Sequence, residues 1–240
     1  MRSTSPPKRA ARSGSIRALR GPLAAAASGI LLSLSFPAAG LWPLVFVALV
    51  PLLVLLHVDS PGPRAERRAS RGVRWAPWIT GILFYSLSFW WIVRLPASAM
   101  TVPWLIYPAL LALGLYLGLF TAFFGWMARF VHRRLGWPVL LTAPFAWGAA
   151  EWLKSSGEMG CTWANVGYAL AREPAWIQMA SVIGAPGLSI WVVAVNALVA
   201  AAIVSPRWPA RAGWILAAAA LVFVPVWWVC LSLRSTCCPF

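Results

Sequence analysis

Long runs without any charged side chain constrain the fold of this sequence more than any other feature. Asp, Glu, Lys and Arg are all absent from six runs, at residues 21–56, 75–93, 95–128, 135–150, 174–206 and 212–233. A helix needs about 20 apolar residues to cross the roughly 30 Å of hydrocarbon in a bilayer. The runs therefore predict an all-α fold, a polytopic bundle of transmembrane helices.

Composition argues against a soluble domain, a disordered chain and a nucleic-acid-binding protein. Hydrophobic residues make up 61% of the chain and charged residues 10%, whereas a soluble domain carries about 25% charged residues. Seventeen Trp also exclude a disordered chain, because disorder requires few aromatic residues. The net charge of +15 does not indicate a nucleic-acid partner, since the basic residues are separated by long apolar runs.

The runs divide into about seven expected spans. Residues 37–40, Pro-Ala-Ala-Gly, favour a turn that splits the first run in two. The first span is short, and the sixth is overlong and contains glycines and a proline that favour a break. We expect a basic tail at 1–21, a transmembrane domain at 22–233 and a short tail at 234–240, with spans near 22–36, 41–57, 75–93, 103–127, 136–153, 176–204 and 212–233.

The basic residues predict the orientation of this bundle. With seven spans, 16 of the 20 Lys and Arg fall on the side of the amino terminus. The other side receives only Arg94, Lys154, Arg172 and Arg234. Because an excess of Lys and Arg marks the cytoplasmic side, we expect the amino terminus inside and the carboxyl terminus outside. The same charges suit contact with anionic lipid headgroups.

Two glycines in the fourth span have the spacing of a helix-packing motif. Gly114 and Gly118 lie four residues apart, with Ala122 a further turn along. Small residues at this spacing let two membrane helices approach closely. The spacing favours packing within the bundle.

The end of the fifth span and the outer loop that follows it hold the residues that are best suited to take part in chemistry. Glu151 is an ionisable group at a span end, and such groups within membranes are often functional. The alternative is that Glu151 is solvated or pairs with Lys154. Lys154, Glu158 and Cys161 do not predict a catalytic triad, because a triad must converge in space around the substrate.

Metal and cofactor sites are not indicated. The four cysteines, Cys161, Cys230, Cys237 and Cys238, have no metal-ligand spacing. Neither histidine, His57 nor His132, has a set of partner ligands nearby in the sequence. We therefore expect no metal, no cofactor and no catalytic residue within these 240 residues.

A series of short motifs runs along nearly the whole chain, and no single one is specific alone. They are Leu34-Ser35-Phe36-Pro37, Gly40-Leu41-Trp42-Pro43, Leu49-Val50-Pro51-Leu52, Gly81 through Trp91-Ile92, Trp147, Glu151-Trp152-Leu153, Gly160, Trp163, Asn165, Gly167-Tyr168, Gln178, Ala180, Gly184, Gly187-Leu188-Ser189 and Asn196-Ala197-Leu198. In this order, over residues 22–233, they resemble the membrane half of one bacterial family, apolipoprotein N-acyltransferase. The chain departs from the family at Gly160-Cys161-Thr162-Trp163, where the family usually reads Gly-Phe-Pro-Trp.

The resemblance implies a lipoprotein maturation enzyme of the bacterial inner membrane. The family moves an acyl chain from a phospholipid to the amino-terminal diacylglyceryl-cysteine of a lipoprotein, through a thioester. Its catalytic Glu, Lys and Cys belong to a periplasmic nitrilase-like domain and have no counterpart here. We therefore expect a truncated chain that is inactive alone, in which Glu151, Trp163, Asn165 and Tyr168 shape the substrate side or dock the catalytic domain.

Two other functions remain open from the sequence. A small carrier or channel is disfavoured by the lack of ionisable residues at mid-membrane depth and of inverted repeats. A non-catalytic scaffold that recruits a separate nitrilase-like periplasmic subunit fits the same residues.

Overall fold

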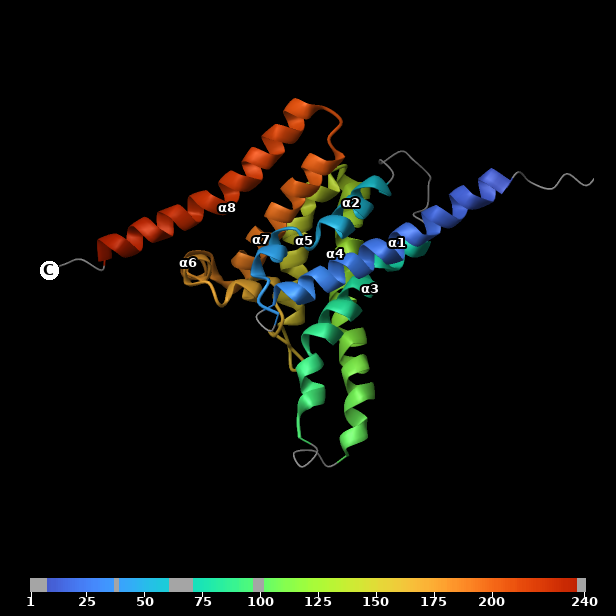
Figure 1. Cartoon of the computed structure of the whole chain (residues 1–240), viewed down its shortest axis with the longest axis horizontal. Helices are drawn as coiled ribbons and strands as arrows, with labels where there is room; N and C mark the ends of the chain where they lie inside the picture. Colours follow the sequence, from blue (N-terminus) through green and yellow to red (C-terminus); the bar gives the residue numbers. More distant parts are fainter. Residues whose placement is uncertain (1–7, 37–38, 61–70, 97–101, 237–240) are drawn as a thin grey trace, which may run out of the picture.

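A computed structural model describes residues 8–36, 39–60, 71–96 and 102–236, and every regular element in these ranges is helical (Figure 1). The all-α fold expected from the sequence is therefore confirmed for these residues. The elements are α1 (Lys8–Ser35), η1 (Trp42–Phe46), α2 (Val50–Val58), α3 (Arg71–Ser88), η2 (Trp90–Arg94), η4 (Pro103–Leu105), α4 (Ile106–Leu135), α5 (Val139–Lys154), η5 (Val166–Leu170), α6 (Pro174–Ile177), α7 (Ala180–Val204) and α8 (Trp208–Thr236), where η marks a 3-10 helix.

Three helical stretches in the described residues are long and apolar enough to cross a membrane. They are Gly72–Arg94, Pro103–Leu135 and Ala180–Val204, of 23, 33 and 25 residues. These stretches correspond to the third, fourth and sixth expected spans. Leu19–Ser35, Trp42–Val58 and Trp208–Phe223 are apolar but shorter, and α5 has 16 residues.

Several elements differ in detail from the expected spans. Residues 41–57 form η1 and the nine-residue α2 instead of one helix, and each of these has a proline as its second residue, which the first turn of a helix accepts. The break that was expected in the overlong sixth span is present and lies at Gly184, where φ is 70° and ψ is 170°. α1 begins at Lys8, within the segment expected as a tail. Pro37 and Ala38 of the expected turn, and the basic residues of 61–70, lie outside the described residues.

Glycines allow the antiparallel helices α3 and α4 to lie side by side (Figure 1). A Cβ atom added to Gly81 would lie 2.8 Å from the Cα atom of Gly118 and 2.7 Å from Oγ1 of Thr121. One added to Gly118 would lie 3.1 Å from side-chain atoms of Ile82, and one added to Gly114 would collide with Ser86. Both glycines of the small-residue motif thus face α3.

A buried asparagine joins the broken second segment to α7. The side-chain oxygen of Asn196 accepts the backbone N–H of Leu49 at 2.9 Å, and its amide donates to the carbonyl oxygens of Val45 and Val192 at 2.8 and 2.9 Å. Val45 and Leu49 flank the gap between η1 and α2, where backbone groups leave the helical pattern. Because lipid offers such groups no water, the asparagine supplies the partners that a continuous helix would have supplied.

We predict that Gly81→Ala lowers the thermal unfolding temperature of the purified protein. The new methyl group would press on the backbone of Gly118, and such overpacking costs about 1–3 kcal/mol. Gly213→Ala in α8 is the control, because nothing lies within 4 Å of a Cβ atom there and alanine favours a helix. Equal melting temperatures for Gly81→Ala and the parent would contradict the close packing of α3 on α4.

Candidate functional site

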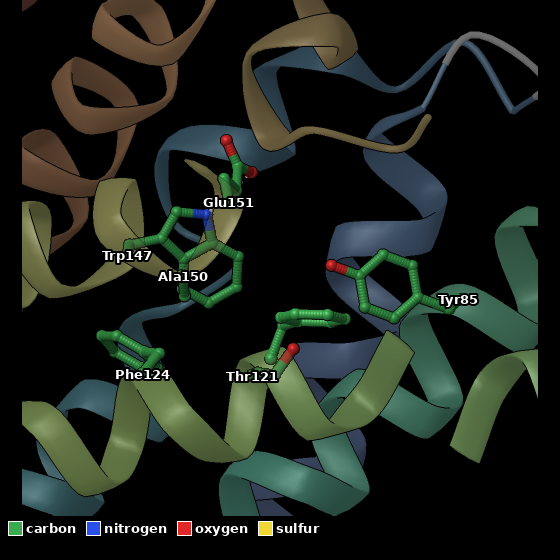
Figure 2. A pocket seen from close by; sticks show the side chains of 7 residues that line it. Tyr85, Thr121, Phe124, Trp147, Ala150 and Glu151 are labelled. Atoms are coloured by element: carbon green, nitrogen blue, oxygen red, sulfur yellow. Dashed lines mark hydrogen bonds between the residues drawn. The ribbon is translucent and has the colours of Figure 1, made fainter. Parts of the chain in front are cut away.

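The carboxylate of Glu151 lies buried in the last turns of α5, with 3% of the residue exposed. One oxygen, Oε1, accepts hydrogen bonds from the indole Nε1 of Trp147 at 2.9 Å and from the backbone N–H of Val166 at 2.8 Å. Figure 2 shows the indole nitrogen of Trp147 close beside this carboxylate. The expected alternative of a solvated Glu151 is therefore wrong: the side chain joins α5 to the start of η5.

Lys154, one turn further along α5, is also buried and also holds the outer loop. Its ammonium group donates to the carbonyl oxygen of Trp163 at 3.0 Å and lies 5.0 Å from the centre of the Tyr85 ring. The Lys154 carbonyl oxygen accepts the backbone N–H of Cys161 at 2.8 Å. Lys154 thus donates its hydrogen bond to the loop backbone and not to Glu151. The second oxygen of Glu151, Oε2, has no hydrogen-bond partner among the described residues.

The hydrogen bonds of Glu151 and Lys154 fix a short segment of the outer loop, residues 163–168. Ala164 has φ of 56°, a left-handed conformation that non-glycine residues rarely adopt. Asn165 is buried, its carbonyl oxygen accepts the backbone N–H of Tyr168 at 2.9 Å, and its side-chain Oδ1 has no partner within the described ranges. The backbone N–H of Gly167 donates to Oγ of Ser189 at 3.0 Å. Residues 163–168 are therefore held by hydrogen bonds to both α5 and α7.

The four candidate residues separate into two buried and two that reach the surface. Glu151 and Asn165 face inward, Tyr168 is half-buried, and 58% of Trp163 is exposed. The Trp163 ring lies 6.1 Å from the ring of Phe89 and 6.2 Å from that of Trp91. Exposed aromatic surface thus continues from Trp163 onto Trp91 of η2, next to the buried ring of Phe89. The functional role of the four residues stays a prediction.

A small cavity lies beneath this loop, between α3, α4 and α5. Figure 2 shows side chains that line it, which are Tyr85, Phe120, Thr121, Phe124, Trp147, Ala150 and Glu151. Its volume of about 10 Å³ is close to the minimum for one water molecule. The cavity is therefore too small to hold an acyl chain.

Within the part of the chain that the structure describes, the arrangement around Cys161 lacks the geometry of a nucleophilic site. Cys161 is half-buried, Glu158 is exposed, and the ammonium group of Lys154 is directed to the carbonyl oxygen of Trp163. A thiolate nucleophile needs a base or cation within hydrogen-bond reach. Among the described residues, no three His, Cys, Asp or Glu side chains gather as metal ligands, and Cys237 and Cys238 lie outside them.

Sequence reasoning missed the structural roles of Trp147 and Lys154. Trp147 precedes Glu151 by four residues, a spacing that brings two side chains together on a helix, so this contact could have been predicted. The contact of Lys154 with the carbonyl oxygen of Trp163 had no such signal, because it depends on the path of an irregular loop.

We predict that Glu151→Ala releases the loop, because the backbone N–H of Val166 and the indole N–H of Trp147 would both lose a buried acceptor. Each unsatisfied buried donor costs about 1–3 kcal/mol. Hydrogen exchange should therefore be faster in peptides that contain residues 163–168. Glu158→Ala, at an exposed carboxylate of the same loop, is the control, and unchanged exchange in Glu151→Ala would show that Glu151 does not hold the loop.

Comparisons with known proteins identify the family. The family model described as "Apolipoprotein N-acyltransferase N-terminal domain" matches residues 28–198. Apolipoprotein N-acyltransferases of Geobacter metallireducens and Gloeobacter violaceus are 31% and 33% identical over 178 and 219 residues, which cover 74% and 88% of this chain but 32% and 40% of those proteins. The chain thus spans about a third to two-fifths of the length of these relatives. The resemblance seen in the sequence is confirmed, and the chain belongs to the apolipoprotein N-acyltransferase family, whose amino-terminal domain it matches.

Proposed function

We propose that these 240 residues form a membrane domain that presents phospholipid and lipoprotein substrates to an N-acyltransferase centre. The family match supports this proposal, because it falls on the amino-terminal domain of proteins named for that activity. In this proposal the acyl chain moves from the phospholipid to the amino-terminal diacylglyceryl-cysteine of the lipoprotein. The protein is then a multi-pass protein of the bacterial inner membrane.

The observation that carries the proposal is the anchored loop at 163–168. Two buried residues of opposite charge, Glu151 and Lys154, each hold the backbone of this loop. Burying a charge is expensive unless hydrogen bonds compensate it, and here the compensation fixes an exposed indole, Trp163, beside Trp91. A fixed aromatic surface suits the docking of a second domain or of a substrate chain, because little conformational entropy is lost on contact.

The acyl-transfer chemistry then belongs to a nitrilase-like domain, in the same protein or in a separate subunit. Among the described residues, the cation near Cys161 is Lys154, and its ammonium group donates to the carbonyl oxygen of Trp163, while Glu158 is exposed; this arrangement does not activate the thiol as a nucleophile. Residues 1–240 alone should therefore not transfer an acyl chain. Their contribution is to hold and orient substrate against the second domain.

The experiment that tests this proposal is a chimera. We would join residues 1–233 of this chain to the remainder of the Gloeobacter violaceus relative and measure acyl transfer from phospholipid to a diacylglyceryl peptide. We expect activity in the chimera and none in residues 1–240 alone. Activity in residues 1–240 alone, or an inactive but folded chimera, would contradict the proposal, and copurification of a nitrilase-like protein with the chain would favour a two-subunit enzyme.

A triple variant of the chimera, with Trp163→Ala, Asn165→Ala and Tyr168→Ala, should transfer acyl chains at least about tenfold more slowly. A tenfold change in rate corresponds to a loss of roughly 1.4 kcal/mol of transition-state stabilisation. The reason is the loss of the aromatic surface and of the buried amide beneath it. Trp208→Ala removes an even more exposed indole at the opposite end of the bundle (73% exposed, against 58% for Trp163) and is the control. If the triple variant folds and retains full activity, the loop has no part in substrate or domain contact.

The seven-span topology is part of the same proposal and has its own test. Single cysteines at positions 157, 172 and 207 would be probed with a membrane-impermeant maleimide on intact spheroplasts, in a background without native cysteines. We expect labelling at 157 and 172, which belong to the outer side, and none at 207 until the cells are opened. Labelling at 207 in intact cells would reverse the orientation.

A further inference from the structure

A cluster of arginines lies where α4 ends and α3 begins, at the other end of α5 from the loop at 163–168. The guanidinium group of Arg129 donates to the carbonyl oxygen of Val73 at 3.0 Å. Because Val73 directly precedes Arg74, this bond places Arg129 close to the backbone of Arg74. Arg133 follows Arg129 by one helical turn and lies on the same side of α4. Arg74 and Arg133 are both exposed and near enough for their charges to act on Arg129.

Among the described residues, no carboxylate forms an ion pair with this cluster of positive charge. The hydrogen-bond partner of Arg129 is a backbone carbonyl and not a carboxylate. The whole chain has five acidic residues against twenty Lys and Arg. Like charges held together repel one another, and an anion bound between them would relieve that repulsion.

An aromatic strip on α4 runs from the arginines toward the middle of the helix. The rings of Trp126 and Phe130 are stacked with their centres 5.2 Å apart, and Phe123 lies 5.7 Å from Trp126. Trp126 and Phe130 are 49% and 39% exposed. The guanidinium carbon of Arg134 lies 5.8 Å from the centre of the Phe130 ring, so cation and aromatic surfaces are continuous.

The chemistry of the two surfaces together matches an amphiphile with an anionic head. Guanidinium groups bind phosphate oxygens through charge-assisted hydrogen bonds, and exposed aromatic rings at membrane depth offer apolar contact to a lipid chain. Free phosphate would use only the arginines and leave the strip unexplained. A nucleic acid would have to place its bases against the aromatic strip. The strip lies inside a candidate membrane-spanning helix, Pro103–Leu135, where a nucleic acid does not reach.

We propose that Arg74, Arg129 and Arg133 bind the phosphate of an anionic phospholipid whose acyl chains lie against Trp126 and Phe130. The site is separate from the proposed acyl-transfer surface, because the whole of α5 lies between them. Its occupant is a bound lipid that holds α3 against α4. The proposal does not depend on the function proposed above.

The test measures binding of phosphatidylglycerol to the purified full chain in detergent, by native mass spectrometry and by the rise in melting temperature. Phosphatidylcholine of equal chain length and inorganic phosphate are the comparison probes. We expect Arg129→Gln with Arg133→Gln to weaken phosphatidylglycerol binding roughly 25-fold, at about fivefold for each arginine removed. The control variant, Arg207→Gln with Arg211→Gln, removes the same charge from the connection between α7 and α8, at the same end of the bundle. It should change binding less than about twofold.

Further variants keep the test decisive if the first does not fold. Arg74→Gln with Arg133→Gln alters only exposed side chains and should show the same roughly 25-fold loss. Trp126→Ala should weaken binding of long-chain phosphatidylglycerol while leaving any binding of inorganic phosphate unchanged. Equal binding of phosphatidylcholine, equal losses in the Arg207 and Arg211 control, or displacement of the lipid by equimolar phosphate would each overturn the proposal.

Discussion

The satisfaction of backbone polar groups in an apolar medium is the constraint on which the rest of this structure depends. At two places in the described ranges where the chain leaves the helical pattern, a buried side chain supplies a hydrogen-bond partner to the backbone. Asn196 does so for Val45 and Leu49 between η1 and α2, and Ser189 does so for Gly167. Because an unsatisfied group costs several kcal/mol in hydrocarbon, these few polar residues decide where the chain can turn within the bundle.

The outer loop follows the same rule with charged groups. Glu151 and Lys154 lie one turn apart on α5, the arrangement of a helix salt bridge, yet each is directed to a different backbone group of the loop. A surface ion pair would stabilise α5 by a few tenths of a kcal/mol. The observed contacts instead tie α5 to the segment that holds Trp163, and this explains why two ionisable residues can be buried at the end of an apolar helix.

The sequence was most informative where a physical pattern repeats along the chain. Uncharged runs predicted the helices, and the Gly114 and Gly118 spacing correctly pointed to close approach of two helices, which the structure places between α4 and α3. The division of residues 41–57 into η1 and α2 was not foreseen, because apolar composition does not report where a helix is interrupted. The burial of Lys154 was also missed, since a lysine beside a loop is ordinarily solvated, and only the path of residues 161–166 shows otherwise.

The length of α5 has a consequence for the membrane around the loop. Its 16 residues extend about 24 Å at 1.5 Å per residue, less than the roughly 30 Å of hydrocarbon in a typical bilayer. In the proposed topology α5 crosses the membrane, and a span shorter than the hydrocarbon is accommodated by local thinning of the bilayer. The bilayer beside α5 would then be thinner than the bilayer beside the longer helices α4 and α7.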